Sequence, residues 1–208
     1  MDQTTNPWET EPTELRFEAH GLTCFAFREH SRAAWRGYVG VPTSSPLYGV
    51  SKSDVIPYPD TWKNQPVDLE KVDILQLFMT ACDPDAVPAA HAPLSMVFTS
   101  HKGLSFSGHI EGFAGLWFFG FDCAHAGDLV PEFEEIHALV AQELSDLQDL
   151  FPNLFEHHST FRPNREYRTL DYVKSICEKL AGELAAYTAW PQAQELLAQV
   201  MATRRTSN

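Results

Sequence analysis

The run LWFFGF at residues 116–121 is the segment that decides the fold. It is apolar on both faces, and a run of this kind is typical of a strand in the middle of a sheet. Two further strand-like runs precede it, at residues 95–99 and 103–108. We therefore expect three strands in this part of the chain, with the last one central.

The first part of the chain predicts a β-hairpin. Residues 22–27 (LTCFAF) and 35–41 (WRGYVGV) are rich in aromatic and β-branched side chains, which favour strands. Residues 1–13 are polar and acidic, and we expect them to form a loose lead-in. Residues 55–93 contain Pro-rich loops around a helix-like period at residues 69–82, and this segment is interpreted as an insertion.

The C-terminal third predicts helices. Apolar residues recur every three or four positions over residues 133–151 and again over residues 170–187. A shorter helix is expected at residues 190–201. Together with the strands, this pattern indicates an α+β fold, an antiparallel β-sheet with two to three C-terminal helices packed on one face. A chain of 208 residues fits a single domain over residues 1–208.

The charge balance excludes one class of partner. The chain has 15 Lys and Arg against 28 Asp and Glu, a formal net charge of −13. Between residues 72 and 161 there are thirteen acidic residues, and Lys102 is the only Lys or Arg. Binding to a phosphate backbone depends on clustered cations, so no direct nucleic-acid partner is expected.

The sequence also predicts the compartment. The first fifteen residues lack the apolar core of a secretory signal. No apolar run approaches the roughly 20 residues that a membrane helix requires. We therefore expect a cytoplasmic protein with no membrane partner. The four cysteines, at positions 24, 82, 123 and 177, are far apart and predict free thiols.

The densest polar group is DCAHAGD at residues 122–128, directly after the most apolar strand. Such a strand end is rigid on one side and open on the other, so it can present side chains to a pocket. In extended chain Cys123 and His125 share a face. One interpretation is structural, with Asp122 in a turn and Cys123 in the core. Another is a metal site, with the candidate ligands His101, Cys123, His125 and Asp128. A Cys123 nucleophile would need an orienting group that the sequence does not identify.

A second polar segment, SHKGLSFSGH, spans residues 100–109. Gly103 and Gly108 would let the backbone approach a ligand closely. The segment contains no Walker or GxGxxG pattern, so it is not a recognisable nucleotide loop. The structural interpretation is a strand bounded by two turns.

Several motifs together resemble a family of small proteins encoded by bacteriophages and prophages. The motifs are WRGYVGVP at residues 35–42, PLYG at 46–49, GLSFSG at 103–108, WFFGFDCAHAGD at 117–128 and YRTLDYV at 167–173. Family members read GYVGVP…HPLYG…VHGGLTFSG…WWFGFDCAHAGD…YRxLDYV, so the resemblance spans Trp35 to about Leu184. This chain departs from the pattern at Lys102, where the family has Gly. The resemblance implies a phage origin and a shared fold, and no reaction.

These observations favour a non-catalytic phage accessory protein that binds a small anionic, nucleotide-like ligand and so counters a host defence. The site would be closed by the loop at residues 42–62. Cations, hydrogen-bond donors and aromatic side chains are the expected ligand-binding groups: Trp35, Arg36, Tyr38, Tyr48, His101, Lys102, Ser105, Asp122, His125 and Asp128.

Two alternatives stay open. The first is a metal-assisted hydrolase in which Asp122, His125, Asp128 and His101 hold the ion. The second is a protein decoy that uses the acidic segment 132–149 to bind a host nucleic-acid-binding protein. The sequence does not identify a cofactor. It also leaves open whether the chain is an enzyme and whether it forms a homo-oligomer.

Overall fold

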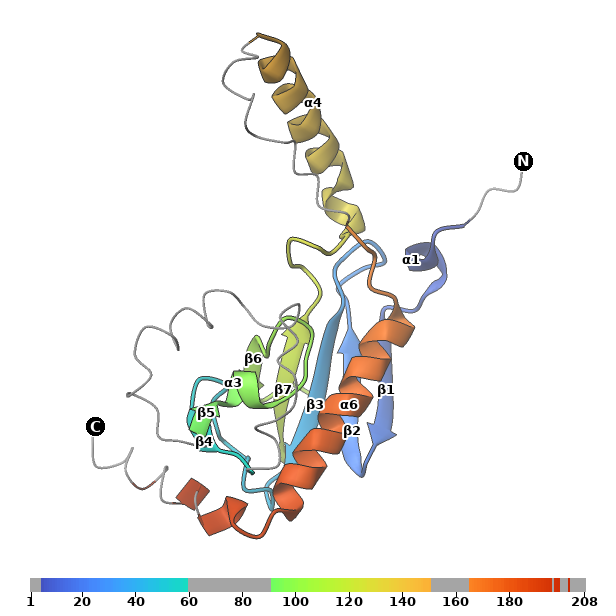
Figure 1. The fold of residues 1–208 in the computed structure, drawn as a ribbon. Coiled ribbons are helices and arrows are strands. Elements are labelled where there is room, and N and C mark those ends of the chain that lie inside the picture. The colour runs from blue at the N-terminus through green and yellow to red at the C-terminus, as the bar shows by residue number, and fades with distance from the viewer. Residues whose placement is uncertain (1–4, 60–90, 151–164, 196, 199–201, 203–208) are drawn as a thin grey trace.

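A five-stranded antiparallel sheet is the frame of the molecule (Figure 1). The computed structural model describes residues 5–59, 91–150, 165–195, 197–198 and 202. The strand order is β1-β2-β3-β7-β6. The bounds are β1 (Glu14–Ala19), β2 (Leu22–Phe27), β3 (Arg36–Pro42), β6 (Phe106–Gly108) and β7 (Leu116–Asp122). With the helix packed on this sheet, the α+β class is confirmed.

Strand β7 is an interior strand, as its apolar run predicts. It pairs with β3 on one side and β6 on the other, with Phe119 opposite both Val39 and Ser107. Phe118, Phe119 and Phe121 are at most 1% exposed. Both faces of this strand are therefore buried.

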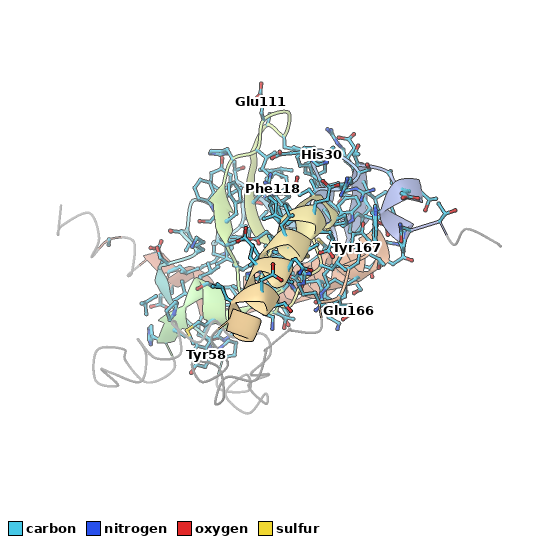
Figure 2. The ribbon with its side chains drawn as sticks, turned by 90° about the horizontal axis from the view of Figure 1, so that it is seen from above. His30, Tyr58, Glu111, Phe118, Glu166 and Tyr167 are labelled. Carbon is cyan, nitrogen blue, oxygen red and sulfur yellow. The ribbon has the colours of Figure 1, made fainter. Side chains whose placement is uncertain are left out.

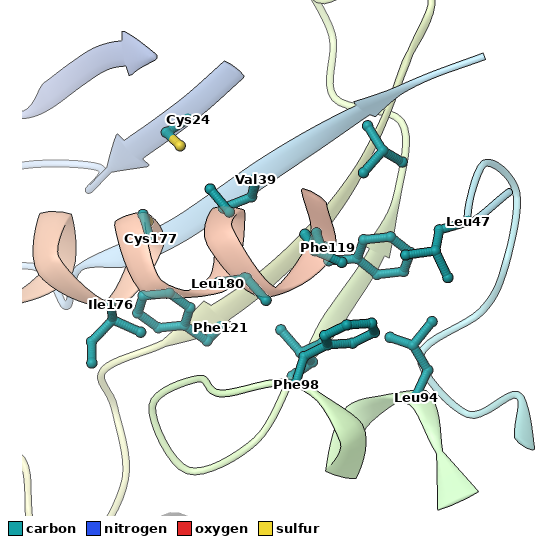
Figure 3. Packing of buried hydrophobic residues seen from close by; sticks show 14 of the residues in the cluster. Cys24, Val39, Leu47, Leu94, Phe98, Phe119, Phe121, Ile176, Cys177 and Leu180 are labelled. Carbon is teal, nitrogen blue, oxygen red and sulfur yellow. The ribbon is translucent and has the colours of Figure 1, made fainter. Parts of the chain in front are cut away.

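Helix α6 (Leu170–Ala189) lies across one face of the sheet (Figures 1 and 3). Thr169 caps its N-terminus, where the side chain accepts a hydrogen bond from Tyr172 N at 3.2 Å. Cys177 and Leu180 face Val39 and Phe121 of the sheet. A Cβ atom on Gly37 would lie 2.8 Å from Cys177 Sγ. Glycine at this position therefore lets the helix approach the sheet closely.

The opposite face of the sheet carries a layer of aromatic side chains. Alternation along the strands places on this face Phe25, Phe27, Tyr38, Phe106 and Phe118, to which Phe113 adds its ring. The Arg16 guanidinium lies 4.7 Å from the centre of the Phe113 ring. We call this surface the aromatic face.

A second, two-stranded sheet joins β4 (Val55–Pro57) to β5 (His91–Pro93). The Tyr187 hydroxyl of α6 donates a hydrogen bond to Pro57 O at 2.8 Å, which ties this sheet to the core. The segment interpreted as an insertion, residues 55–93, thus begins and ends on one strand pair. The helix expected within it at residues 69–82 lies outside the described residues.

The strand expected at residues 95–99 was wrong in its first part, which belongs to helix α3 (Leu94–Val97). Leu94 is fully buried and Phe98, four positions later, is 4% exposed. A spacing of four places both side chains on one side of a helical turn, and burial of both favours that turn over a strand. Strand β1 was also missed, although its sequence ELRFEA alternates between exposed and half-buried positions. The short strands β4 and β5 were not predicted either.

The remaining elements are α1 (Pro7–Thr10), the 3-10 helix η2 (Pro131–Phe133) and α4 (Glu134–Leu150). The described part of the expected loose lead-in is fixed, because buried Arg28 hydrogen-bonds to Trp8, Glu11 and Pro12. Helix α4 projects away from the sheet, whereas α6 packs on it (Figure 1).

Helical turns at residues 193–195 and 197–198 follow α6, within the range expected for a third helix. Through Ala193 and Leu197 these turns join the core. Within the described residues, no helix is both long enough and apolar enough to cross a bilayer.

Candidate functional site

Asp128 is the centre of a buried polar cluster that joins three segments of the chain. The residue is 3% exposed. Its Oδ2 accepts hydrogen bonds from His101 Nε2 at 2.7 Å and from His125 N at 3.0 Å, and its Oδ1 accepts from Arg168 Nε at 2.8 Å. Burial alone raises the pKa of Asp128, but the hydrogen bonds outweigh burial and hold the pKa well below its ordinary value.

Backbone hydrogen bonds place the two sequence-distant motifs side by side. Leu129 N donates to Glu166 O at 2.9 Å, and Glu166 N donates to Gly127 O at 3.1 Å. The turn after β7 is itself closed by Asp128 N, which donates to His125 O at 2.8 Å. As a result, Arg168, just before α6, reaches the Asp128 carboxylate.

His101 is held from both sides of its ring. An ionised carboxylate can only accept a hydrogen bond, so His101 Nε2 carries the ring proton and donates it in the hydrogen bond to Asp128. In the neutral ring His101 Nδ1 is then an acceptor, and it lies 2.8 Å from the Tyr172 hydroxyl. Burial raises the pKa of Tyr172, which keeps this hydroxyl protonated. The adjoining Lys102 has φ of 58°, a left-handed conformation that favours glycine over residues with a side chain.

His125 has a ring nitrogen that makes no hydrogen bond within the cluster. Its Nδ1 is buried and has no hydrogen-bond partner. It lies 3.5 Å from Asp128 Oδ2 and 3.9 Å from Asp122 Oδ1. The side chain is 33% exposed, so one edge of the ring reaches solvent. The Asp128 carboxylate raises the pKa of His125 above its ordinary value.

Three of the four candidate metal ligands come together. Ligand atoms of His101, His125 and Asp128 all lie within 4.8 Å of one another. Cys123 is not part of this group. It is 3% exposed, and burial raises the pKa of its thiol well above the ordinary value. A protonated thiol is neither a good metal ligand nor a nucleophile.

A pocket of about 420 Å³ opens beside this cluster, at the end of the aromatic face. Alternation along β3, β6 and β7 turns Arg36, Tyr38, Phe106 and Asp122 away from α6 and toward the pocket. The rings of Tyr38 and Phe106 meet edge to face with centroids 5.5 Å apart. The pocket therefore has an aromatic wall and a polar rim.

The rim carries more negative than positive charge. Its carboxylates come from Glu29, Asp122 and Glu132, against the single guanidinium of Arg36. Arg36 is already paired with Glu29, with Nη1 3.1 Å from Glu29 Oε1. Asp122, which is 33% exposed, accepts one hydrogen bond, from Ala124 N at 3.2 Å. The Asp122 carboxylate can therefore accept further hydrogen bonds from a ligand in the pocket.

The ten predicted ligand residues divide into four groups. Four line the pocket, namely Arg36, Tyr38, Ser105 and Asp122. Three form the Asp128 cluster, namely His101, His125 and Asp128. Lys102 lies in the turn after His101. Trp35 and Tyr48 are elsewhere. Trp35 is 1% exposed and its Nε1 donates to Glu11 Oε2 at 3.2 Å, while Tyr48 packs against Trp117 near the start of β7.

Several residues of the two sites were not predicted, among them Phe106 of the aromatic wall. Glu29 reaches the pocket from the loop after β2 and Glu132 from η2, and neither segment carries a motif. Arg168 and Tyr172 reach the Asp128 cluster from the start of α6. The signal for the latter pair was present, because both belong to the motif YRTLDYV.

Comparisons with known proteins do not extend this description. No protein-family model, no curated protein and no solved structure matches the chain. The function must therefore be inferred from the two sites themselves.

Proposed function

We propose that this chain binds a small molecule in the pocket at the end of the aromatic face, and that the ligand carries a basic nitrogen on a planar apolar body. The pocket is the observation that carries the proposal. Its volume of about 420 Å³ lies in the range of small-molecule sites. Such sites combine apolar walls with a few placed polar groups, and this pocket has both.

Charge selects the class of ligand. Three carboxylates and one guanidinium give the lining a net charge of −2, and the guanidinium is engaged by Glu29. An anionic group would meet repulsion and would have to displace Glu29 from Arg36. A protonated amine or amidine would instead gain an ion pair with Asp122. This favours a basic ligand over the anionic, nucleotide-like ligand expected from the sequence.

The aromatic wall selects the shape. Tyr38 and Phe106 present ring surfaces and edges at the pocket, on which a planar ring can pack. Burial raises the pKa of Tyr38, so its hydroxyl stays a neutral donor and acceptor at physiological pH. Ser105 adds a second hydroxyl at the rim.

The test is calorimetry with matched probes. Benzamidine and benzoate have similar size and opposite charge, and ATP represents the nucleotide class. We expect benzamidine to bind and benzoate and ATP not to bind. Asp122→Asn should weaken benzamidine binding by about tenfold, the cost of one charged hydrogen bond. Glu111→Gln, an equal loss of charge in the loop before β7, should leave binding unchanged.

Two results would end the proposal. If none of the probes binds, the pocket has no ligand of this class. If benzoate or ATP binds and Asp122→Asn strengthens that binding, the anionic ligand expected from the sequence is the correct class.

The resemblance to phage-encoded proteins supports a biological role for such a pocket. In this role the chain captures a small host molecule in the cytosol of the infected cell and so counters a host defence. Plating phage on cells that express the chain measures the effect. Protection of the phage should be lost with Asp122→Asn and kept with Glu111→Gln.

The Asp128 cluster supports a second candidate function, metal-assisted hydrolysis. Two imidazole nitrogens and a carboxylate oxygen are the donor set of many catalytic zinc sites, and the unpartnered Nδ1 of His125 is a free donor. With a metal on His101 Nε2, the ring proton would lie on Nδ1 and would be donated in a hydrogen bond to the Tyr172 hydroxyl, 2.8 Å away. Arg168 Nε would keep its hydrogen bond to Asp128 Oδ1, and bonds of this kind orient metal ligands. A zinc ion held there would supply a water of lowered pKa.

Metal analysis tests this candidate directly. Protein purified without chelator is assayed for zinc, and calorimetry with zinc chloride follows. We expect one ion per chain, lost with His125→Ala and with Asp128→Asn and kept with His109→Gln, a histidine outside the cluster. Substoichiometric metal combined with no calorimetric binding would remove the hydrolase candidate and leave the pocket proposal standing.

A further inference from the structure

Helix α4 presents an apolar stripe to solvent. Its exposed side chains, with Phe133 just before the helix, are Phe133 at 42%, Ile136 at 58%, Leu139 at 67%, Val140 at 48% and Leu147 at 43%. These positions recur at helical spacing and so share one face. The helix projects beyond the end of the sheet (Figure 1). Contiguous exposed apolar side chains of this kind mark docking surfaces.

The helix that carries the stripe is acidic, although Arg165 pairs with Glu134 and Arg32 with Glu135 at its first turn. The helix has five acidic residues and no Lys or Arg, the acids being Glu134, Glu135, Glu143, Asp146 and Asp149. Glu143 is exposed and lies four positions after Leu139 and four before Leu147. It therefore stands within the apolar stripe rather than on its border.

The position of Glu143 argues against a second copy of this chain as the occupant. Glu143 is close to the middle of α4. In an antiparallel pair of copies the two Glu143 side chains would meet near the centre of the interface. In a parallel pair each acidic residue of the helix would lie opposite the same residue of the second copy. Like charges brought together at an interface cost several kcal/mol, so self-pairing is disfavoured.

We propose that α4 docks a basic amphipathic helix of a partner protein. The apolar face of that helix covers Ile136, Leu139 and Leu147, and a Lys or Arg at its centre pairs with Glu143. Pairing along apolar faces supplies the affinity, and the flanking charges set the choice of partner. Between apolar side chains the central ion pair is partly shielded from water and salt, so it contributes more than an exposed pair.

The experiment uses the full chain and a designed peptide. The probe is a labelled 18-residue peptide with Leu on one helical face and Lys elsewhere, followed by fluorescence anisotropy. A peptide of the same composition, scrambled so that it has no apolar face, is the control ligand. We expect the amphipathic peptide to bind at least about tenfold more tightly than the scrambled peptide, since only the former can bury the stripe.

Three variants locate the site. Glu143→Lys should weaken binding by about tenfold or more, because it places like charges together. The double change Ile136→Ser with Leu139→Ser should weaken it similarly. Glu111→Lys makes the same charge change in the loop before the start of β7, whereas α4 follows the other end of that strand. Figure 2 shows Glu111 at the edge of the molecule and apart from α4, so this change should alter affinity less than about twofold. Leu147→Ser replaces the double variant if the latter loses its thermal transition.

Three outcomes would overturn the proposal. These are equal binding of the scrambled peptide, full affinity in the serine variants, and a dimer found by light scattering that the serine variants dissociate. The last result would assign the stripe to a second copy of the chain.

Discussion

Arg28 and Asp128 are both buried charged side chains that hydrogen-bond to the segment leading into α6. They differ in whether the buried polar atoms around them all have hydrogen-bond partners. Arg28 is fully buried, and five hydrogen bonds use its donors. The acceptors are the carbonyls of Trp8, Glu11, Pro12 and Ser31 and the hydroxyl of Tyr167. Its guanidinium also lies 4.6 Å from the Trp35 ring centre.

The Asp128 cluster is not satisfied in the same way. The Asp128 carboxylate accepts three hydrogen bonds, but the neighbouring His125 Nδ1 and Ser100 Oγ are buried without hydrogen-bond partners. Unpartnered buried polar atoms are costly and rare, so a chain retains them where something else requires them. The difference indicates that Arg28 holds the N-terminal segment in place, whereas the Asp128 cluster has a donor left for a ligand.

Removing Arg28 should have the largest effect on stability. Arg28→Met leaves four carbonyls without their donor and leaves Glu11, whose Oε2 lies 4.0 Å from Arg28 Nη1, without its cation. Removing one partner of a buried ionic group costs about 3–5 kcal/mol. The free energy of unfolding from urea titration measures the loss.

Two further variants make this test specific. Arg28→Lys should recover little, because one ammonium cannot reach acceptors that a planar fork spans. Lys174→Ala removes an exposed cation 3.7 Å from Glu178 and should cost at most about 0.5 kcal/mol. If Arg28→Met lowers the free energy of unfolding no more than Lys174→Ala does, Arg28 does not hold the N-terminal segment in place.

Asp128→Asn should have an intermediate effect that depends on pH. The amide keeps the shape of the side chain but loses the charged hydrogen bonds to Arg168 and His101, at a cost of about 2–3 kcal/mol at pH 7. The folded-state pKa of Asp128 is lowered, so its contribution is present above the unfolded pKa of about 4 and is lost as the pH falls through the folded value.

Urea titrations at pH 7 and below about pH 4 therefore separate charge from shape. The gap between wild type and Asp128→Asn should narrow at the lower pH. Asp146→Asn, an exposed acid on α4, should shift stability by at most about 0.5 kcal/mol at either pH. An Asp128→Asn gap that is equal at both values would mean that packing, and not the carboxylate charge, holds the cluster together.

The same comparison separates what sequence can predict from what it cannot. The central strand and α6 were predictable, because apolar patterning records which faces are buried, and Thr169 and the period of 170–187 identify one helix. Residues 133–151 carry an equally regular period, yet α4 is not packed on the sheet. Periodicity indicates that a helix has an apolar face, and it does not say what covers that face.

The candidate sites were predictable only in part, for a related reason. Asp122, His125 and Asp128 are close in sequence, and their local density predicted a site. Their partners are distant: Arg168 and Asp128 are 40 residues apart, and His101 and Tyr172 are 71 apart. Pairings over such separations depend on strand order. The predicted cationic residues are therefore separated in the structure, with Arg36 in the pocket lining and His101 and His125 in the Asp128 cluster.

The titration of His125 is the smallest expected effect and the one that tests the comparison most directly. With chelator present, NMR should place the pKa of His125 above its ordinary value of about 6.5, because the Asp128 carboxylate favours the protonated ring.

A raised folded pKa contributes stability that is present below the unfolded pKa and is lost as pH rises through the folded value. Stability should therefore decline slightly above about pH 6.5 in wild type and not in His125→Ala. The Arg28 cluster contains no histidine, so Arg28→Met should keep that slope while lowering stability throughout.

In Asp128→Asn the pKa of His125 should fall toward its ordinary value. A wild-type His125 that already titrates at or below that value would mean that its ring does not interact with Asp128, and the two buried ions would then differ in position only.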